Sequence, residues 1–275
     1  MKVLILGAKG ALGLTFIDLY HDQEVTAWDR DELDITEDDT VMKKITELKP
    51  ELIINCAAYN AVDNAEQDRA SAELINGNAV GFIAKAANAV SAVMVHFSSN
   101  YVFDGNNSAG YNEDDKPSPQ SVYAKSKLLG EMEIAENTEK YYVVRTSNLY
   151  GRHSETGKPS FVETMIKLGT EGKEIKGITD EFASPTYVVD LAHAVRALIE
   201  EKRPFGIYHL INSGSASWYD WAKEIFMIKG IKANLIEAKR TDFNRPAQRP
   251  QYGVLNNTKF LELRPWTEAL KEYLS

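Results

Sequence analysis

The chain begins with a short apolar run that passes directly into a glycine-rich turn. Lys2 to Leu6 has the composition of a strand buried on both faces, and a helix is predicted from Leu14 to Tyr20. Glycines between a strand and a helix let the backbone approach a pyrophosphate, and the helix N-terminus offers free N–H groups. The pattern predicts the first βα unit of a dinucleotide-binding sheet. The predicted cofactor contacts in the turn are Gly7, Gly10, Ala11, Leu12 and Gly13.

The end of the second predicted strand bears on the choice of cofactor. This strand, Glu24 to Ala27, is followed by Asp29 and Arg30. An acidic residue about twenty positions after the glycines is where a ribose hydroxyl is held. Asp29 favours NADH because a carboxylate repels a 2′-phosphate, whereas Arg30 can pair with that phosphate and keeps NADPH open. Asp34 and Ile35 follow where an adenine ring would be flanked.

Strands and helices alternate along the first 211 residues. Further strands are predicted at Leu52–Asn55, Ala92–Phe97, Tyr141–Arg145 and Gly206–Ile211, and further helices at Asp39–Leu48, Ala70–Ala89, Val122–Glu136 and Val188–Glu201. Such alternation predicts an α/β fold with a Rossmann-like, doubly wound parallel sheet. Ligands bind at the carboxyl ends of its strands. Ala57, Ala58 and Tyr59 follow one strand end, and we predict that they contact the cofactor together with Asn76.

The remaining residues predict a smaller C-terminal substrate lobe. The predicted division assigns residues 1–150 and about 186–211 to the dinucleotide-binding domain, and about 151–185 and 212–275 to the lobe. The lobe contains a polar loop from Arg152 to Ser160, and its predicted elements are Phe161–Thr170, Ile175–Ile178, Asp220–Ile228 and Lys232–Ile236. Its turn from Arg245 to Pro250 is basic and restricted by prolines. Guanidinium groups bind phosphates bidentately, so we predict that Arg249 holds a diphosphate.

A tyrosine and a lysine four residues apart stand on the helix predicted from Val122. Tyr123 and Lys127 share one helical face, so both side chains can reach the same pocket. A free tyrosine titrates near pH ~10, and a fixed cation nearby lowers that pKa, which suits a general acid or base. Ser99 follows the strand Ala92–Phe97, where a hydroxyl can bind a reacting carbonyl oxygen. Ser99, Tyr123 and Lys127 are therefore the predicted catalytic residues.

Composition excludes several other classes of protein. The formal charge is −9, without a dense basic cluster, which argues against a nucleic-acid partner. The single cysteine, Cys56, suits a reducing cytoplasm, and no apolar run approaches the ~20 residues of a membrane span. Met1 is followed directly by strand-like sequence without a signal peptide. The five histidines lack metal-ligand spacing, so we predict no metal site and a cytoplasmic protein outside the membrane.

Together these motifs resemble the dTDP-4-dehydrorhamnose reductase branch of the extended short-chain dehydrogenases. The similarity runs nearly end to end, and its stretches include Gly7 to Gly13, Ala61 to Glu66, Ile83 to Asn88, Ser98 to Gly105, Tyr123 to Glu131, Arg145 to Ser147, Phe182 to Thr186, Trp218-Tyr219, Arg245 to Pro250 and Leu255 to Phe260. The resemblance implies reduction of the 4-keto group of a nucleotide sugar by NADPH or NADH. Ser99 would orient the carbonyl, Tyr123 would protonate it, and Lys127 would tune Tyr123 and hold the ribose.

The resemblance also implies that Val62, Asn100, Asn148 and Arg249 bind the substrate, and it contains departures. Asn100 stands where the family usually has Asp, and Asn148 where it often has Trp, so the sugar is less defined than the chemistry. Thr15 replaces a glutamate that helps some relatives bind magnesium between subunits. A metal-bridged dimer is therefore not expected, and we predict a monomer or weak homodimer. Cys56 replaces a usual alanine.

Two alternatives remain open. The first is another nucleotide-sugar enzyme: a reductase of a different 4-keto sugar, an epimerase or a 4,6-dehydratase. A dehydratase needs an acid and base pair directly after the catalytic hydroxyl residue, where this chain has Asn100 and Tyr101. The second is a non-catalytic, cofactor-binding subunit that regulates methionine adenosyltransferase, as relatives of this branch do. The full set of catalytic side chains favours an enzyme.

Overall fold

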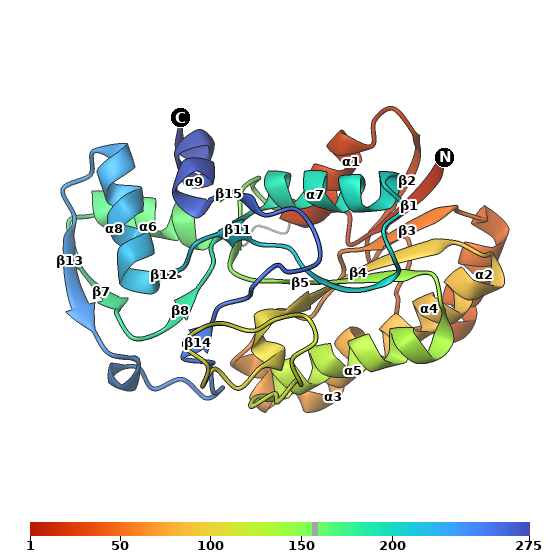
Figure 1. Cartoon of the computed structure of the whole chain (residues 1–275), viewed down its shortest axis with the longest axis horizontal. Coiled ribbons are helices and arrows are strands. Elements are labelled where there is room, and N and C mark those ends of the chain that lie inside the picture. Colours follow the sequence, from red (N-terminus) through yellow and green to blue (C-terminus); the bar gives the residue numbers. More distant parts are fainter. Residues whose placement is uncertain (156–158) are drawn as a thin grey trace.

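A six-stranded parallel sheet forms the centre of the protein (Figure 1). The structure is a computed structural model and describes residues 1–155 and 159–275. The strand order is β2-β1-β3-β4-β5-β10. The strands are β1 (Lys2–Leu6), β2 (Glu24–Trp28), β3 (Leu52–Asn55), β4 (Val93–Ser99), β5 (Tyr141–Thr146) and β10 (Gly206–His209). The order reverses between β1 and β3, which places a ligand-binding crevice at their carboxyl ends.

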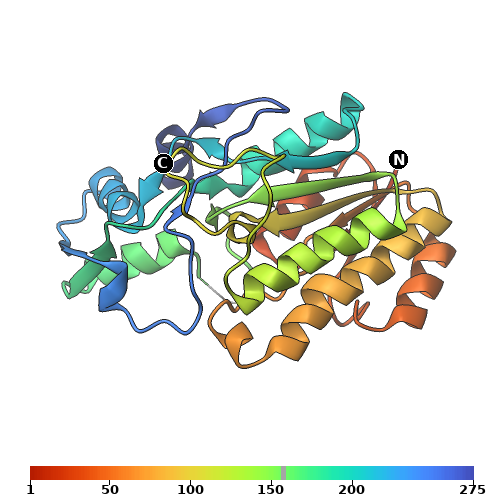
Figure 2. The same cartoon turned by 60° about the horizontal axis from the view of Figure 1, so that its bottom comes forward.

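Helices cover both faces of the sheet, as its strands of nearly continuous apolar sequence require. On one face α1 (Ala11–Leu19) and α7 (Val188–Glu200) bury Phe16, Leu191 and Val195. On the other face α2 (Asp38–Leu48), α4 (Ala79–Ala89) and α5 (Val122–Asn137) bury Ile45, Val80 and Ile83 (Figure 2). The predicted α/β doubly wound sheet is therefore confirmed.

The helix predicted from Ala70 to Ala89 contains one irregular turn. It consists of α3 (Arg69–Glu73), a π-helical turn η2 (Leu74–Asn78) and α4. The turn lies against α5 at very short range: a Cβ on Gly77 would lie 2.4 Å from Leu129 Cδ2, and a Cβ on Gly130 would lie 2.2 Å from the Asn76 carbonyl oxygen. Glycines at both contacts allow the close approach, and the π turn changes the direction of the side chains that follow it.

A second group of elements has its own hydrophobic core on one side of the sheet (Figure 1). Its helices are α6 (Phe161–Thr170), α8 (Trp218–Lys229) and α9 (Trp266–Leu274), and a parallel pair is formed by β7 (Glu174–Ile178) and β13 (Asn234–Ala238). Trp221, Ile225, Phe226 and Leu270 are buried between them. The short strands are β6 (Leu149–Tyr150), β8 (Phe182–Ala183), β9 (Thr186–Tyr187), β11 (Asn212–Ser213), β12 (Ala216–Ser217), β14 (Tyr252–Gly253) and β15 (Leu263–Pro265), and the 3-10 turns are η1 (Asn64–Glu66), η3 (Asn100–Val102) and η4 (Arg240–Asp242).

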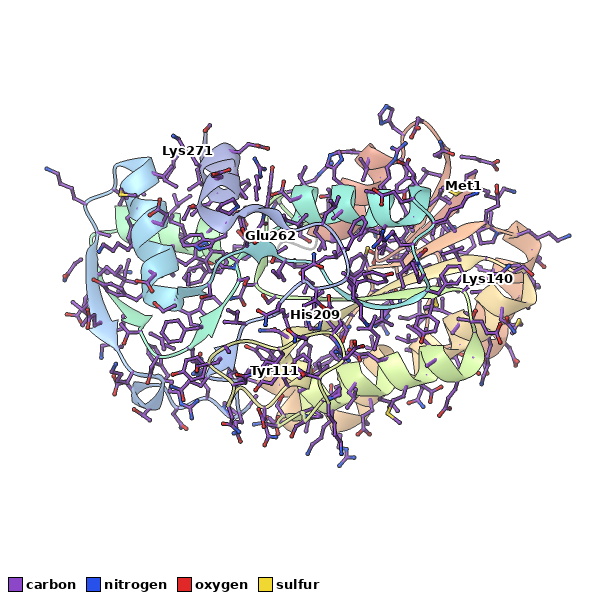
Figure 3. The ribbon with its side chains drawn as sticks, in the orientation of Figure 1. Met1, Tyr111, Lys140, His209, Glu262 and Lys271 are labelled. Carbon is purple, nitrogen blue, oxygen red and sulfur yellow. The ribbon has the colours of Figure 1, made fainter. Side chains whose placement is uncertain are left out.

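The C-terminal segment crosses back over the loop that follows β4. Tyr111 N–H donates to the Val254 carbonyl, and Asn256 N–H donates to the Tyr111 carbonyl. His209 Nδ1 lies 3.0 Å from the Asn256 carbonyl. Tyr111 and His209 are labelled in Figure 3. The rings of Tyr111 and Phe103 stack with centroids 4.3 Å apart. These contacts bring β14 to the edge of the sheet where β4 ends.

Most predicted elements agree with the structure within three residues. The strand Leu52–Asn55 and the helix Phe161–Thr170 have the predicted bounds, whereas the first helix begins at Ala11 and β4 continues to Ser99. Helix α9 was not predicted, although Trp266, Leu270 and Leu274 recur on one face. The loop predicted from Arg152 to Ser160 includes residues 156–158, which lie outside the described residues. None of the helices described is long and apolar enough to cross a membrane.

Candidate active site

One large cavity runs along the carboxyl edge of the sheet and continues to α6. Its volume is about 760 Å³. Most of the predicted site residues line it: Gly7, Gly10, Ala11, Leu12, Gly13, Asp29, Arg30, Asp34, Ile35, Ala57, Ala58, Val62, Ser99, Asn100, Tyr123, Lys127 and Asn148. Residues far apart in the sequence therefore meet at the switch point of the sheet, where doubly wound proteins bind ligands.

The three predicted catalytic side chains meet at one position in this cavity. Ser99 is the last residue of β4, and its Oγ accepts a hydrogen bond of 3.2 Å from Tyr101 N–H. Ser121 caps α5, so Tyr123 and Lys127 occupy its first two turns on a buried face. Lys127 is only 2% exposed, and its ammonium has no hydrogen-bond partner within the described chain. Since the side chain lines the cavity, a ligand bound there can accept a hydrogen bond from the Lys127 ammonium.

Burial shifts the pKa of Tyr123 in the direction opposite to the one predicted from the sequence. It raises the pKa of Tyr123 to about 12, although the neighbouring Ser99 hydroxyl acts in the opposite direction as a hydrogen-bond partner. Burial also lowers the pKa of Lys127 to about 8, which the carboxylate of Glu131 partly offsets. The predicted lowering of the Tyr123 pKa by Lys127 is therefore wrong for the protein without ligands, because desolvation dominates. Tyr123 is a neutral phenol at pH 7.

The glycine turn leaves the N-terminus of α1 open toward the cavity. The first N–H groups of a helix have no intrahelical acceptors. Gly10 is the N-cap of α1 and has no side chain that could accept from them. Gly7 has φ +73°, which disfavours other residues. A Cβ on Gly13 would lie 2.3 Å from the Gly7 carbonyl oxygen, whereas a Cβ on Gly10 would have its nearest contact at 3.4 Å. Gly7 and Gly13 shape the turn, and Gly10 leaves space in front of it.

This difference predicts the effect of Gly10→Val. We expect the variant to fold, because Gly10 has φ −75° and ψ 157° and its Cβ meets no backbone atom closer than 3.4 Å. The added side chain occupies the space of a pyrophosphate, and overpacking of about 1–3 kcal/mol weakens dinucleotide binding roughly ten- to a hundredfold. Titration with NADH measures the loss, and thermal melting checks the fold. Unchanged NADH affinity in the folded variant contradicts the placement of the pyrophosphate at Gly10. Gly13→Ala serves as the comparison, because its Cβ would meet the Gly7 carbonyl oxygen and destabilise the turn itself.

The other end of the cavity carries the side chains predicted to hold the adenosine. The Asp29 carboxylate accepts hydrogen bonds from Lys9 N–H (2.9 Å) and Arg30 N–H (2.8 Å), which fix it beside the glycine turn. Trp28 and Thr36 also line this end and were not predicted. Trp28 is the last residue of β2, and this position at the carboxyl end of a strand was the available signal. These groups form an apolar slot with a carboxylate at its rim.

Two predicted cofactor contacts lie behind the wall of the cavity. Asn76 Oδ1 accepts from Tyr59 N–H at 2.8 Å, and Asn76 Nδ2 donates to the Tyr59 carbonyl and to Ser126 Oγ, both at 3.0 Å. Both amide atoms of Asn76 are thus used within the protein. Neither Asn76 nor Tyr59 lines the cavity, so their observed role is to connect the loop after β3 to α5.

Arg249, predicted to hold a diphosphate, is engaged by an acid in this structure. Its guanidinium forms two hydrogen bonds of 2.9 and 2.8 Å with the Asp63 carboxylate, and it does not line the cavity. Arg245 pairs in the same way with Glu181. The guanidinium of Arg249 lowers the pKa of Asp63. Both arginines of the basic turn are therefore neutralised by carboxylates from distant segments.

Tyr101 is a cavity residue that sequence reasoning missed. Its ring packs edge-on against the Tyr123 ring, with centroids 5.8 Å apart, and its buried phenol interacts with Arg249. Tyr101 therefore lies between the catalytic position and the basic turn. Its place two residues after Ser99 was the available signal.

Two of the four departures from the family pattern, Asn100 and Asn148, line the cavity. Asn100 Nδ2 donates to the Gly253 carbonyl at 2.8 Å, and Ser99 Oγ is 3.3 Å from Asn100 Oδ1. A carboxylate at position 100 could not donate that hydrogen bond. Asn148 has φ +47°, a conformation that asparagine tolerates better than most residues, and it lines the cavity. Thr15 is buried in α1, where its hydroxyl donates to the Ala11 carbonyl.

The fold and the cavity define a Rossmann-type protein of the dehydrogenase and reductase class. The family model of the RmlD substrate binding domain matches residues 1–275, and the chain belongs to that family. Among the residues that the structure describes, no group of three histidine, cysteine or acidic side chains could hold a metal.

Relatives agree over almost the whole chain. A dTDP-4-dehydrorhamnose reductase from Bacillus anthracis, solved in complex with NADP, is 37% identical, with a TM-score of 0.95 and coverage of 99% of this chain and 98% of that one. A dTDP-4-dehydrorhamnose reductase from Clostridium acetobutylicum is 41% identical, with a TM-score of 0.95 and coverage of 100% and 98%. A probable dTDP-4,6-dihydroxy-2-methyloxan-3-one 4-ketoreductase from Streptomyces antibioticus is 37% identical over 99% of this chain and 94% of its own length. The chain is an NAD(P)H-dependent oxidoreductase.

Proposed function

We propose that this protein reduces the 4-keto group of a dTDP-4-keto-6-deoxy sugar, converting dTDP-4-dehydrorhamnose to dTDP-L-rhamnose with NADPH or NADH. The observation that carries the proposal is the meeting of Ser99, Tyr123 and Lys127 in the same cavity as the glycine turn. The similarity to reductases named for this reaction supports the choice of substrate.

The residues present fit a dinucleotide. The open N-terminus of α1 suits the pyrophosphate, Asp29 suits the ribose hydroxyls, and the unpartnered ammonium of Lys127 suits the second ribose. When bound, the reduced nicotinamide supplies the hydride.

The chain's own residues then supply the proton and the orientation. Ser99 Oγ donates to the substrate carbonyl oxygen, which stabilises the charge that develops there. Tyr123 holds a proton at neutral pH, because burial raises its pKa, and delivers it to the same oxygen. As the phenol loses its proton, the Lys127 ammonium on the same helical face stabilises the phenolate.

The nucleotide end of the substrate has a candidate place near the second core. A smaller cavity of about 160 Å³ lies between α6, β7 and α8, with Phe161, Trp218 and Phe243 in its wall and Arg245 at its side. Aromatic rings around this cavity suit a nucleobase, and Arg245 suits the attached phosphates if it leaves its partner Glu181. We place the base there and the sugar at Tyr123.

A second candidate substrate is another nucleotide-linked 4-keto sugar. It is favoured by Asn100 and Asn148 at the sugar end and by the similarity to the Streptomyces 4-ketoreductase. The test is oxidation of NADH and NADPH with a panel of freshly prepared dTDP-4-keto sugars. Fastest turnover with dTDP-4-dehydrorhamnose supports the main proposal, and a different preferred sugar supports the second. Cofactor binding without turnover on any of them contradicts both and favours the regulatory alternative.

We further propose a domain division, a cellular location and an oligomeric state for the protein. Residues 1–150 with about 186–211 form the cofactor domain, and about 151–185 with 212–275 form the substrate lobe, in keeping with their separate cores. The protein acts in the cytoplasm as a monomer or weak homodimer. The buried hydroxyl of Thr15 is not a metal ligand, so a metal-bridged dimer is not part of the proposal.

Arg249→Ala tests the substrate side of the proposal. We expect the KM for the sugar nucleotide to rise about one to two decades, the equivalent of one charge-assisted hydrogen bond, while cofactor affinity is retained. Steady-state kinetics with each substrate varied in turn measures both.

Arg249 has two possible roles: binding the diphosphate directly, or holding the segment that carries Val62. The variant Asp63→Asn distinguishes them. If the guanidinium leaves Asp63 to bind the diphosphate, freeing it keeps or lowers the KM for the sugar nucleotide. If Arg249 acts by holding the segment that carries Val62, both variants raise that KM. An unchanged KM for the sugar nucleotide in Arg249→Ala contradicts both roles.

A further inference from the structure

The adenosine end of the cavity is surrounded by acidic side chains, and each cation beside it already has a partner. Arg30, the residue that could accept a 2′-phosphate, is 83% exposed, and its Nε lies 3.3 Å from Asp34 Oδ2. Lys9 Nζ lies 2.7 Å from Asp31 Oδ2. Lys44 donates to the Glu32 carbonyl and lies over the Trp28 ring.

Asp34 is held in place independently of Arg30. Its Oδ1 accepts hydrogen bonds from Thr36 N–H at 3.0 Å and from Thr36 Oγ1 at 2.7 Å. These bonds also keep the pKa of Asp34 below its ordinary value, so the side chain is charged at neutral pH. If Arg30 turned toward a phosphate, the Asp34 charge would stay beside it.

Asp29 adds a second fixed carboxylate at the same rim. It accepts two backbone N–H groups, and a carboxylate has about four acceptor positions, so two remain. Ribose hydroxyls can donate to them. A 2′-phosphate dianion has no proton to donate. It meets the negative charges of Asp29 and Asp34, while the Arg30 guanidinium is paired with Asp34.

We propose that this chain prefers NADH to NADPH, and that Asp34 is a specificity determinant because it withholds Arg30 from a 2′-phosphate. The inference rests on the proposed function and assigns Asp34 a role beyond flanking the adenine.

The test is a direct titration of both cofactors, without sugar, followed by tryptophan fluorescence, since Trp28 lines the cavity. We expect NADH to bind about tenfold more tightly than NADPH, and Asp34→Asn to shift the ratio of the two dissociation constants about tenfold toward NADPH. Asparagine can still accept from Thr36, so the loop is preserved. In the double variant Arg30→Ala/Asp34→Asn the shift should be smaller than in Asp34→Asn alone, because the Asp34 charge is gone but no guanidinium remains to be released.

Asp39→Asn is the matched control, an acid of the same segment that does not line the cavity, and its ratio should equal that of the wild type. Equal or tighter binding of NADPH by the wild type overturns the inference, as does an unchanged ratio in Asp34→Asn. If both cofactors bind equally and support turnover, the proposed function stands and only the preference fails. If neither binds, the proposed function fails as well.

Discussion

Tyr123→Phe should lose turnover by about 10²- to 10⁴-fold, the usual contribution of a positioned general acid, while dinucleotide affinity stays close to that of the wild type. The substitution removes only the phenolic oxygen. The ring remains in its edge-on contact with Tyr101 and in its buried position on α5, so the fold should be retained. The rate of NADH oxidation with the 4-keto sugar measures the first quantity, and fluorescence titration measures the second.

A second hydroxyl in the same cavity provides the control. Tyr101→Phe removes the phenol that faces Arg249 instead of the one beside Ser99, and we expect a loss in kcat of less than about tenfold. Near-normal turnover in Tyr123→Phe would mean that the proton comes from another group. Loss of both turnover and cofactor binding would mean that the phenolic oxygen also contributes to holding the cofactor.

Local sequence patterns predicted the parts of the site that depend on neighbouring residues. Apolar strands followed by glycine or small residues located the carboxyl edge of the sheet, and helical spacing placed Tyr123 and Lys127 on one face. Ser99 could be added because it follows a strand directly. In each case the relevant contact lies within one element or at its end, where periodicity is informative.

The parts that were not predicted depend on burial or on contacts between distant segments. The pKa of Tyr123 was assigned from a nearby cation, but the desolvation that raises it is a property of the packed helix. The Arg249 and Asp63 pair joins residues 186 positions apart. Asn76 lies within the π turn, and its amide is bonded to Tyr59 and Ser126, which are distant in sequence. No single-sequence pattern contains that information.

A buried ion pair connects the catalytic helix to the sheet. Arg145 Nε and one terminal nitrogen donate to the two oxygens of Glu131, at 2.9 and 2.6 Å, and the two side chains are only 2% and 4% exposed. Ser98 Oγ donates to the same carboxylate, and the Arg145 guanidinium lies over the Phe103 ring. Glu131 is one turn beyond Lys127, so the pair fixes the helix that carries Tyr123 and Lys127.

Glu131→Ala should therefore cost about 3–5 kcal/mol of unfolding free energy, because it leaves the Arg145 guanidinium buried without its counter-charge. Urea denaturation measures the loss as a lower midpoint at an unchanged slope. The matched control is Glu136→Ala, an exposed glutamate on the same helix, for which we expect a change of less than about 0.5 kcal/mol. Glu131→Gln keeps the shape and should fall between the two, because Arg145 and Ser98 retain an acceptor but the charge is gone. A loss below about 1 kcal/mol in Glu131→Ala would show that Arg145 finds another partner or water, and that the helix is held by its apolar contacts instead.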